Sequence, residues 1–460
     1  MKQTVKLSFE DYFRELIGDA EAQQFFDTVK EKKRGPRTLR VNTLKITKAK
    51  LTTWLKSQGY EVRDSEFSTD GLVLEGRGEP LALKLPYHAG FTYPQDSASM
   101  FAVEVLDPQP GELAIDLTAA PGGKTTHIAQ RMKNTGVLVA NDLDSRRLKA
   151  LHSNLERLGV WNTFVTRATP YRLSQHFGEV FDRVLLDPSC SGEGLLVTSD
   201  GKPDFWNKKA LKRYSAEQFG LLCSAFGMLK PGGRLVYSTC TLNDVEDDDV
   251  VMRLLKKFPE AVIEDVQPTG AQVPEQIPRL SGEEFKGIRF WPHKTGTKGF
   301  FCVAITKTES CSEVPPAQRS KLRPLKTAQL HRFTSYLKKT FGCELPDANF
   351  YKKDNQVFPI SKDAGRYPLP SKFSLALPLF ELSSEEIRLT HSGATLLGLS
   401  AKTGVYKLSR DEVEAAFERT PIENSGEAAP ELMIAKYKSF PVGVVKLTEK
   451  HVEVRMPRQA

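Results

Sequence analysis

The stretch Leu113-Ala-Ile-Asp-Leu117, which continues as Thr118-Ala-Ala-Pro-Gly-Gly-Lys-Thr-Thr126, predicts a buried strand that turns through a glycine-containing loop into a helix. A second apolar run with a polar end, Val137-Leu-Val-Ala-Asn-Asp142, follows that helix. Strands that alternate with helices predict a parallel sheet. In such sheets the carboxyl edge is where ligands bind, so the residues after each strand are the candidates for chemistry.

The same alternation extends over the middle of the chain. Strands are expected at 113–117, 137–140, 164–166, 184–186, 235–237 and 299–305, and helices at 125–132, 145–158, 210–229 and 244–258. Pro231-Gly232-Gly233 is expected to stop the third of these helices. The predicted fold class is α/β, with a doubly wound, mostly parallel, Rossmann-like sheet.

The flanks of this region predict smaller modules. Residues 1–95 are expected to form an N-terminal α/β module with one amphipathic helix over Phe9–Val29, and residues 96–307 the central domain. A linker is predicted at 308–325 because it contains Pro-Pro and serines, then basic residues. Beyond it we expect an α+β region, divided into an intermediate part at 326–389 and a C-terminal part at 390–460.

Composition excludes several classes of function. The 460 residues are 40% hydrophobic and 27% charged, which is ordinary for a globular protein. No stretch approaches a membrane span and the start resembles no signal peptide, so we expect a cytoplasmic protein with no membrane partner. The six cysteines form no Cys-x-x-Cys pair and the eight histidines no clustered motif, so no metal is expected.

The net charge of +8 is unevenly spread. Two basic runs, 30–40 and 319–339, flank the central domain, and the second has Phe333 and Tyr336 interleaved with its basic residues. Either run alone is most simply a solvated helix face or linker. Together they favour contacts with the phosphate backbone of a nucleic acid.

The glycine-containing loop is the candidate cofactor site. It ends like a phosphate-binding P-loop at Gly123-Lys124-Thr125, but that motif requires glycine where this chain has Thr118. Asp142, at the end of the next strand, is placed to accept hydrogen bonds from ribose hydroxyls. This combination favours an adenosyl ligand without phosphates, S-adenosylmethionine. The alternative is that Asp142 simply caps the helix that begins at Ser145.

Two cysteines follow neighbouring predicted strands, in Leu186-Asp-Pro-Ser-Cys190 and Val236-Tyr-Ser-Thr-Cys240. The simplest interpretation of a cysteine is a small buried hydrophobe, but the polar ends of these strands favour reactive thiols beside Asp187. A thiolate that adds to C6 of cytosine makes C5 nucleophilic towards a methyl donor, and a second thiol can assist release of the product. Chemistry alone permits either order of the two cysteines.

At these residues the chain resembles the Nop–Sun family of S-adenosylmethionine-dependent RNA cytosine-C5 methyltransferases, most closely the bacterial RsmF-type enzymes that act on 16S rRNA. The matching segments are Asp116-Leu-Thr-Ala-Ala-Pro-Gly-Gly-Lys-Thr125, Leu186-Asp-Pro-Ser-Cys-Ser-Gly-Glu-Gly194 and Tyr237-Ser-Thr-Cys-Thr-Leu242, within a resemblance that covers roughly Gly35 to Ile305. It implies a methyltransferase domain at 96–307, an RNA-binding N-terminal module and a PUA-like RNA-binding domain at 390–460.

The resemblance also assigns roles. It implies that Cys240 is the nucleophile, that Cys190 helps to resolve the covalent adduct, and that Asp187 contacts the cytosine and lies beside the methionine end of the cofactor. The cofactor-binding residues it implies are Thr118, Ala119, Ala120, Pro121, Gly122, Gly123, Lys124, Asp142, Thr169 and Asp187.

Two positions depart from the family pattern. The family usually has Asp-Ala-Pro-Cys where this chain has Asp187-Pro188-Ser189-Cys190, so the turn that carries the thiol must be built differently. Many members have an aspartate for the adenine amine where this chain has Thr169, whose hydroxyl is the remaining candidate.

The expected partner is therefore RNA, namely 16S rRNA in the small ribosomal subunit. The alternatives are a tRNA methyltransferase of the same family and an RNA-binding assembly factor with weakened catalysis. DNA methylation is disfavoured because DNA cytosine methyltransferases use the cysteine of their Pro-Cys motif and need no counterpart of Cys240.

Overall fold

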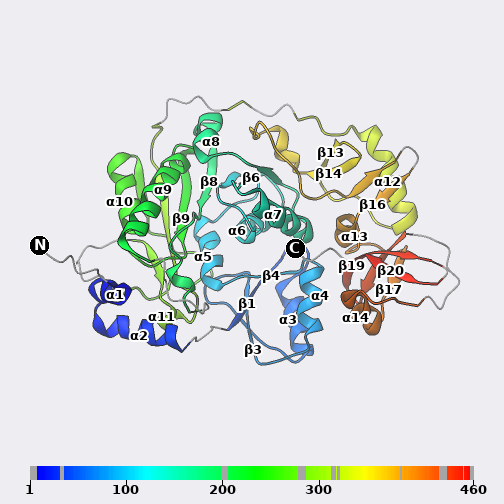
Figure 1. The fold of residues 1–460 in the computed structure, drawn as a ribbon. Coiled ribbons are helices and arrows are strands. Elements are labelled where there is room, and N and C mark those ends of the chain that lie inside the picture. The colour runs from blue at the N-terminus through cyan, green and yellow to red at the C-terminus, as the bar shows by residue number, and fades with distance from the viewer. Residues whose placement is uncertain are drawn as a thin grey trace, which may run out of the picture.

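A computed structural model gives the fold shown in Figure 1. It describes residues 8–31, 36–197, 206–277, 286–311, 317–318, 322–383, 386–423, 432–448 and 450–455. Residues 32–35 of the first basic run and residues 319–321 of the second lie outside the described residues. No described helix is long and apolar enough to cross a membrane.

The centre of the molecule is one mixed sheet with the strand order β10-β12-β9-β8-β5-β6-β7 and with β11 paired to β12. Its strands are β5 (Leu113–Asp116), β6 (Val137–Asn141), β7 (Thr163–Thr166), β8 (Phe181–Leu186), β9 (Leu229–Thr239), β10 (Ala261–Glu264), β11 (Ile288–Phe290) and β12 (Phe300–Lys307). The strands β7, β6, β5, β8 and β9 pair in parallel, whereas β12 runs antiparallel to β9. The predicted α/β fold class is confirmed.

Helices bury both faces of this sheet. The helices are α5 (Ser97–Leu106), α6 (Gly123–Arg131), α7 (Ser145–Leu158), α8 (Pro170–Phe177), α9 (Lys208–Phe226), α10 (Asp248–Lys257) and the short α11 (Pro292–Thr295). Alternate residues of β5 enter different cores: Leu113 and Ile115 pack with residues of α8, α9 and α10, and Ala114 packs with residues of α5, α6 and α7. Burial on both faces explains why these strands read as continuous apolar runs.

Two local predictions are wrong. The helix expected over Phe9–Val29 is divided into α1 (Phe9–Ile17) and α2 (Asp19–Lys30), because Gly18 between them has a φ of 84°, which is incompatible with a continuous helix. Pro231-Gly232-Gly233 does not stop a helix, since α9 already ends at Phe226. The three residues lie within β9, where the pairing register with β8 shifts to accommodate them.

The N-terminal module is an antiparallel sheet with the order β2-β3-β1-β4, accompanied by two helices. Its elements are β1 (Arg37–Val41), α3 (Lys48–Ser57), β2 (Glu61–Asp64), β3 (Gly71–Glu75), α4 (Leu81–His88) and β4 (Thr92–Pro94). Helices α1 and α2 lie apart from this sheet (Figure 1). They pack Phe13 and Phe25 against Leu242 and Trp291 of the central domain.

Two further four-stranded sheets follow the central domain. The first comprises β13 (Asn349–Lys353), β14 (Gln356–Ile360), β15 (Phe380–Leu382) and β16 (Ile387–Leu389), preceded by α12 (Thr327–Phe341) and with the 3₁₀ helix Lys362–Gly365. The second comprises β17 (Val405–Lys407), β18 (Leu432–Tyr437), β19 (Phe440–Leu447) and β20 (Val452–Arg455), with α13 (His391–Leu397) and α14 (Arg410–Glu418).

These C-terminal elements pack against the rest of the chain. Ser374 forms an antiparallel bridge with Val165 of β7, at the edge of the central sheet. Phe440 and Val442 share a core with Leu85 and Phe91 of the N-terminal module. Ala317 of the 308–325 segment lies on the central domain, where its N–H donates to the Phe177 carbonyl, whereas the Leu325 N–H donates to the Phe350 carbonyl of β13.

Candidate active site

A cavity of about 290 Å³ lies at the carboxyl edge of the central sheet. Eight of the residues predicted for the site line this cavity: Thr118, Ala119, Ala120, Pro121, Gly123, Lys124, Asp187 and Cys240. The described lining of this cavity does not include Gly122, Asp142, Thr169 or Cys190. The loop after β5 and the residues after β8 and β9 meet there because parallel neighbours end at the same edge.

The two predicted thiols are in contact. Cys190 follows β8 and Cys240 follows β9, and their sulfurs lie 3.2 Å apart. A hydrogen bond from the Cys190 thiol lowers the pKa of Cys240, and the charge of Lys124 lowers it further. The same bond, together with burial, raises the pKa of Cys190 well above its ordinary value. Because Cys240 also lines the cavity, it is the better placed of the two to act as a nucleophile.

Asp187 connects the thiol region to the cofactor loop. Its carboxylate accepts hydrogen bonds from Lys124 Nζ at 2.7 Å and from Ser238 Oγ at 3.0 Å. Burial by itself lowers the pKa of Lys124, but the Asp187 carboxylate raises it above its ordinary value, so the ammonium stays charged. The Thr118 hydroxyl donates to the Asp187 carbonyl and accepts from the Asp187 N–H.

Asp142 holds the cofactor loop from outside the cavity. One of its oxygens accepts from the Ala120 N–H at 3.1 Å, the other accepts from the Asp144 N–H at 2.9 Å, and Arg147 lies 3.4 Å away. The alternative interpretation of Asp142 as the cap of the following helix is wrong. Asp144 caps that helix, α7, by accepting from the N–H groups of Arg146 and Arg147.

Thr169 is an exposed residue at the start of α8. Its side chain accepts a hydrogen bond from the Arg172 N–H and so caps this helix. The structure therefore brings most of the loop residues together with Cys240 and Asp187, while Thr169 lies beyond the end of β7.

Several residues of the cavity were not predicted as site residues, among them Lys298, Phe300 and Asp96. Phe300 is the first residue of β12 and Lys298 precedes it; β12 is antiparallel and so begins where β9 ends. Asp96 caps α5, and burial raises its pKa. The prediction considered only residues that follow the carboxyl ends of parallel strands, so it missed these positions. The signal that could have found Asp96 is the polar segment Tyr93-Pro-Gln-Asp96, which belongs to the resemblance.

The basic runs are only partly available to a ligand. Arg40 of the first run is buried, and it donates to Gln95 at 3.1 Å and to Thr126 at 2.6 Å. Phe333 of the second run is buried against Phe380, so it cannot stack on a base. The described basic residues of the second run are exposed: Arg323, Lys326, Arg332, Lys338 and Lys339.

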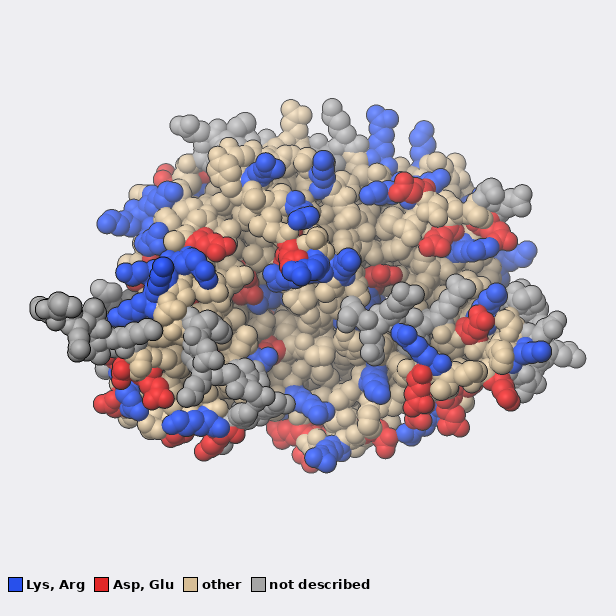
Figure 2. Space-filling model, viewed as in Figure 1, with Lys and Arg blue, Asp and Glu red and all other residues tan. Residues whose placement is uncertain are grey.

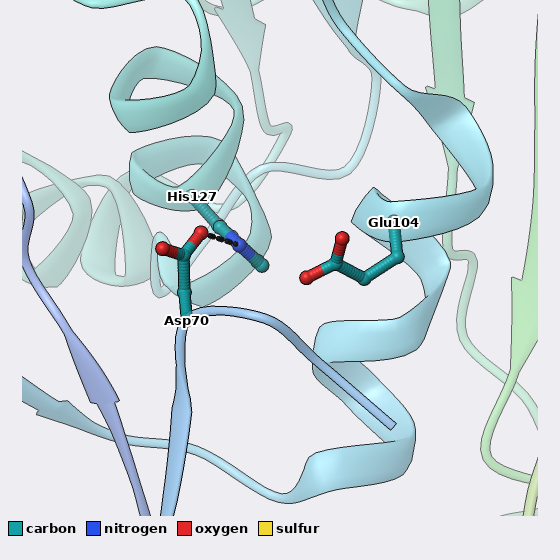
Figure 3. A group of neighbouring side chains, drawn as sticks. All are labelled: Asp70, Glu104 and His127. Atoms are coloured by element: carbon teal, nitrogen blue, oxygen red, sulfur yellow. Dashed lines mark hydrogen bonds and ion pairs between the residues drawn. The ribbon is translucent and has the colours of Figure 1, made fainter. Parts of the chain in front are cut away.

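A second titratable cluster lies between the N-terminal module and the central domain (Figure 3). It contains Asp70, Glu104 and His127, whose possible metal-ligand atoms all lie within 4.8 Å of one another. His127 Nε2 is 3.1 Å from Asp70, and Arg131 Nη1 lies 3.4 Å from Glu104 and 3.9 Å from Asp70. The guanidinium pairs with both carboxylates, and Glu104 also accepts from the Ser68 hydroxyl and the Thr69 N–H, so we interpret this cluster as an ion-paired junction rather than as a metal centre.

Comparison with known proteins gives consistent similarities. A family model described as 16S rRNA methyltransferase RsmB/F matches residues 103–306, and one described as the RsmF/B-like, ferredoxin-like domain matches residues 11–79. The ribosomal RNA small subunit methyltransferase F of Aeromonas salmonicida is 30% identical over 92% of this chain and 90% of the relative. The protein of the same name from Erwinia tasmaniensis is 28% identical over 98% of this chain and 96% of the relative.

Solved structures agree with these similarities. A methyltransferase homologue from Pyrococcus horikoshii has 32% identity and a TM-score of 0.58, covering 65% of this chain and 93% of that chain. NSun6 from the same organism, solved with SFG (a SAM analogue), has 26% identity and a TM-score of 0.55, covering 66% of this chain and 98% of that chain.

Proposed function

Because this chain belongs to the RsmB/F family of 16S rRNA methyltransferases, within the Nop–Sun family, we propose that it methylates C5 of cytosine in RNA with S-adenosylmethionine as donor. We further propose that its substrate is 16S rRNA of the small ribosomal subunit. The observation that carries the proposal is the contact of the two sulfurs at 3.2 Å, with Cys240 in the cavity beside the Lys124–Asp187 pair. That contact also argues against an assembly factor with weakened catalysis.

The residues of the cavity fit the proposed cofactor. Three carboxyl groups line it, from Asp96, Asp116 and Asp187, together with the ammonium groups of Lys124 and Lys298. The excess of carboxyl groups suits a ligand that carries a sulfonium and an ammonium. The loop Thr118–Lys124 would approach the ligand through its backbone. Asp142 holds this loop, and to bind the ribose one of its oxygens would have to leave the Ala120 or the Asp144 N–H group. When bound, S-adenosylmethionine supplies an electrophilic methyl group.

The protein's own groups account for activation of the cytosine. The Cys240 thiolate, favoured by the Cys190 hydrogen bond and the Lys124 charge, attacks C6 and forms a carbon–sulfur bond. The Asp187 carboxyl group would lie beside the cytosine edge, where an acid near N3 assists this addition. Because Asp187 accepts from Lys124 in the free protein, it must take up a proton before it can act as that acid. Once C5 carries the methyl group, a water molecule takes the C5 proton. The electron pair of that C–H bond restores the C5–C6 double bond and breaks the carbon–sulfur bond, which releases Cys240 as a thiolate. The Cys190 thiol stabilises the departing Cys240 thiolate by the same hydrogen bond.

RNA binding is supported by the distribution of charge. On the face shown in Figure 2, Lys and Arg side chains predominate at the top and upper left, whereas Asp and Glu alternate with Lys and Arg along the lower margin. The five exposed basic residues of the second run add a possible phosphate contact surface on and before α12. We propose that the N-terminal module and a PUA-like domain at 390–460 complete the RNA-binding surface.

Bisulfite sequencing of total RNA from cells with and without this protein tests the function. We expect one or more 16S rRNA cytosines to lose protection from conversion when the protein is absent. Loss of a tRNA mark instead would favour the tRNA alternative, and loss of no mark would refute the proposal.

The roles of the cysteines are tested separately. Cys190→Ala should accumulate a covalent protein–RNA adduct that survives denaturing electrophoresis, because release is slowed. Cys240→Ala should form no adduct and be inactive, and methylation by Cys240→Ala would show that the assigned roles are wrong.

A further inference from the structure

The loops that carry the two thiols are joined by a buried glutamate. Glu193 lies three residues after Cys190 and is 1% exposed, and the residues that follow Cys240, namely Thr241, Leu242 and Asn243, are fully buried. The 3₁₀ helix Glu193–Leu195 directs the glutamate towards them.

The Glu193 carboxylate accepts five hydrogen bonds. Its Oε2 atom accepts from Thr241 Oγ1 at 2.6 Å and from the N–H groups of Leu242 and Asn243, each at 3.0 Å. Its Oε1 atom accepts from Trp206 Nε1 at 2.7 Å and from Asn243 Nδ2 at 2.9 Å. Burial raises the pKa of Glu193, but four of its five hydrogen bonds come from N–H groups, which can only donate, and these favour the carboxylate.

Further bonds link the residues next to each cysteine. Ser191 Oγ lies 2.8 Å from Thr241 Oγ1, and the Gly194 N–H donates to the Cys240 carbonyl at 2.9 Å. Glu246 accepts from the Ser191 N–H at 3.0 Å and from Asn243 Nδ2 at 2.9 Å. Glu193 makes the largest number of these links, and it bonds to three successive residues after the proposed nucleophile.

We propose that Glu193 is a positioning residue for methyl transfer, which locks the Cys190 and Cys240 loops together and thereby keeps the two sulfurs in hydrogen-bonding contact. The role in methyl transfer rests on the proposed function. The sulfur contact itself exists in the free protein and does not depend on that function. Since Cys190 favours the Cys240 thiolate only while the sulfurs touch, separation of the loops must make Cys240 harder to ionise.

The charged groups around Cys240 make this effect measurable. The Lys124 charge favours its thiolate and the Asp187 charge opposes it, while Glu246 and Asp187 oppose ionisation of Cys190. Lys298 also lines the cavity. None of these side chains is altered when Glu193 is changed, so a shift in Cys240 reactivity reports the Cys190 contact.

The test is the pH dependence of Cys240 alkylation by iodoacetamide, followed by mass spectrometry on the free full-length protein. In Glu193→Gln one carboxylate oxygen becomes an N–H₂ group, which faces N–H donors that cannot accept from it and so weakens the link between the loops. We therefore expect the rate of Cys240 alkylation at pH 7 to fall several-fold and to approach the parent rate near pH 9. RNA methylation at pH 7 should fall about tenfold to 100-fold, since an error of about 1 Å costs about that much, and it should also recover towards pH 9.

A matched control separates positioning from loss of stability. Glu104→Gln alters another buried glutamate, in the ion-paired junction, and should leave the pH profile of Cys240 alkylation unchanged. If Glu193→Gln does not fold, Thr241→Val removes one of the five bonds and should shift the profile in the same direction by less.

A folded Glu193→Gln protein whose alkylation profile matches the parent would overturn the proposal, as would an activity loss of equal size at pH 7 and pH 9. The alkylation assay requires no methyltransferase activity. Failure of the positioning role of Glu193 is therefore distinguishable from failure of the proposed function, which RNA sequencing tests.

Discussion

Gly194→Ala should damage both catalysis and stability. The Gly194 N–H donates to the Cys240 carbonyl, and its own carbonyl accepts from the Gly299 N–H at 3.0 Å. A Cβ atom on Gly194 would lie 2.1 Å from the Gly299 oxygen and 2.4 Å from the Gly299 carbonyl carbon. Both are backbone atoms, so no side chain can rotate away from the added methyl group.

The size of the effect follows from that overlap. Ordinary contact begins at 3.4 Å, so the Gly299 backbone must move by about 1.3 Å relative to the Cys240 loop. Gly299 and Cys240 both line the cavity. A displacement of about 1 Å at reacting groups costs about 100-fold in rate, and overpacking costs about 1–3 kcal/mol of folding free energy.

The assay is transfer of a labelled methyl group to RNA, with urea unfolding measured in parallel. We expect a loss of about 100-fold in kcat/KM for Gly194→Ala. Gly299→Ala approaches the same contact from the other side, since its Cβ would lie 2.5 Å from the Gly194 Cα, and it should show a similar loss. Agreement of the two variants would locate the damage at this contact.

Gly220→Ala is the matched control. Gly220 lies in α9, and an added Cβ has no other atom within 4 Å. The substitution should leave activity unchanged and stabilise the protein by about 1 kcal/mol, because alanine favours helix more than glycine does. If Gly194→Ala retained full activity and unchanged stability, the close approach of Gly194 to the Gly299 backbone, and with it the placement of the Gly194 loop, would be refuted.

Three further predictions concern charged groups. Arg131→Ala should lower the free energy of unfolding in urea by about 3–5 kcal/mol, because it leaves buried carboxylates without their cation. The control Arg146→Ala, at an exposed ion pair, should lower it by at most about 1 kcal/mol. If incubation of the parent protein with a chelator produced the larger loss of stability, the ion-pair interpretation would fail. Lys124→Met should slow Cys240 alkylation several-fold at pH 7, with recovery at higher pH, and an unchanged profile would argue against an electrostatic role for this lysine. Burial raises the pKa of Asp116 to about 6, so this carboxyl group binds its proton more tightly in the folded than in the unfolded protein. The free energy of unfolding in urea should therefore fall by about 3 kcal/mol between pH 4 and pH 6. The Asp116→Asn variant should lack that decline.

Local pattern predicted most strands of the central sheet but missed β10, β11 and α8, and it misplaced the ends of other elements. Apolar runs predicted β5 and β6, and α7 was predicted with its observed bounds, since burial on both faces of a parallel sheet leaves a strong local signal. Pro231-Gly232-Gly233 was misassigned because its place within β9 depends on pairing with β8. That pairing involves residues far away in the sequence.

The candidate site shows the same division. Cys190, Cys240 and Asp187 were predicted because each follows a recognisable strand, and the structure brings them together. The proximity of Lys298 and Phe300 depends on the antiparallel direction of β12, which no local pattern encodes. The roles proposed for Asp142 and Thr169 remain predictions, and the structure places both residues outside the described lining of the cavity.

The sequence by itself determined the alternation of strands and helices around the site, the family, and the two loops that deliver thiols to one edge of the sheet. Only the tertiary structure decided that the sulfurs touch, that Arg40 is an internal hydrogen-bond donor, and that Glu193 joins the two loops. The physical reason is the range of each effect. Secondary structure follows from hydrophobic spacing over a few residues, whereas burial, hydrogen-bond partners and thiol ionisation depend on segments that meet only when the chain is folded.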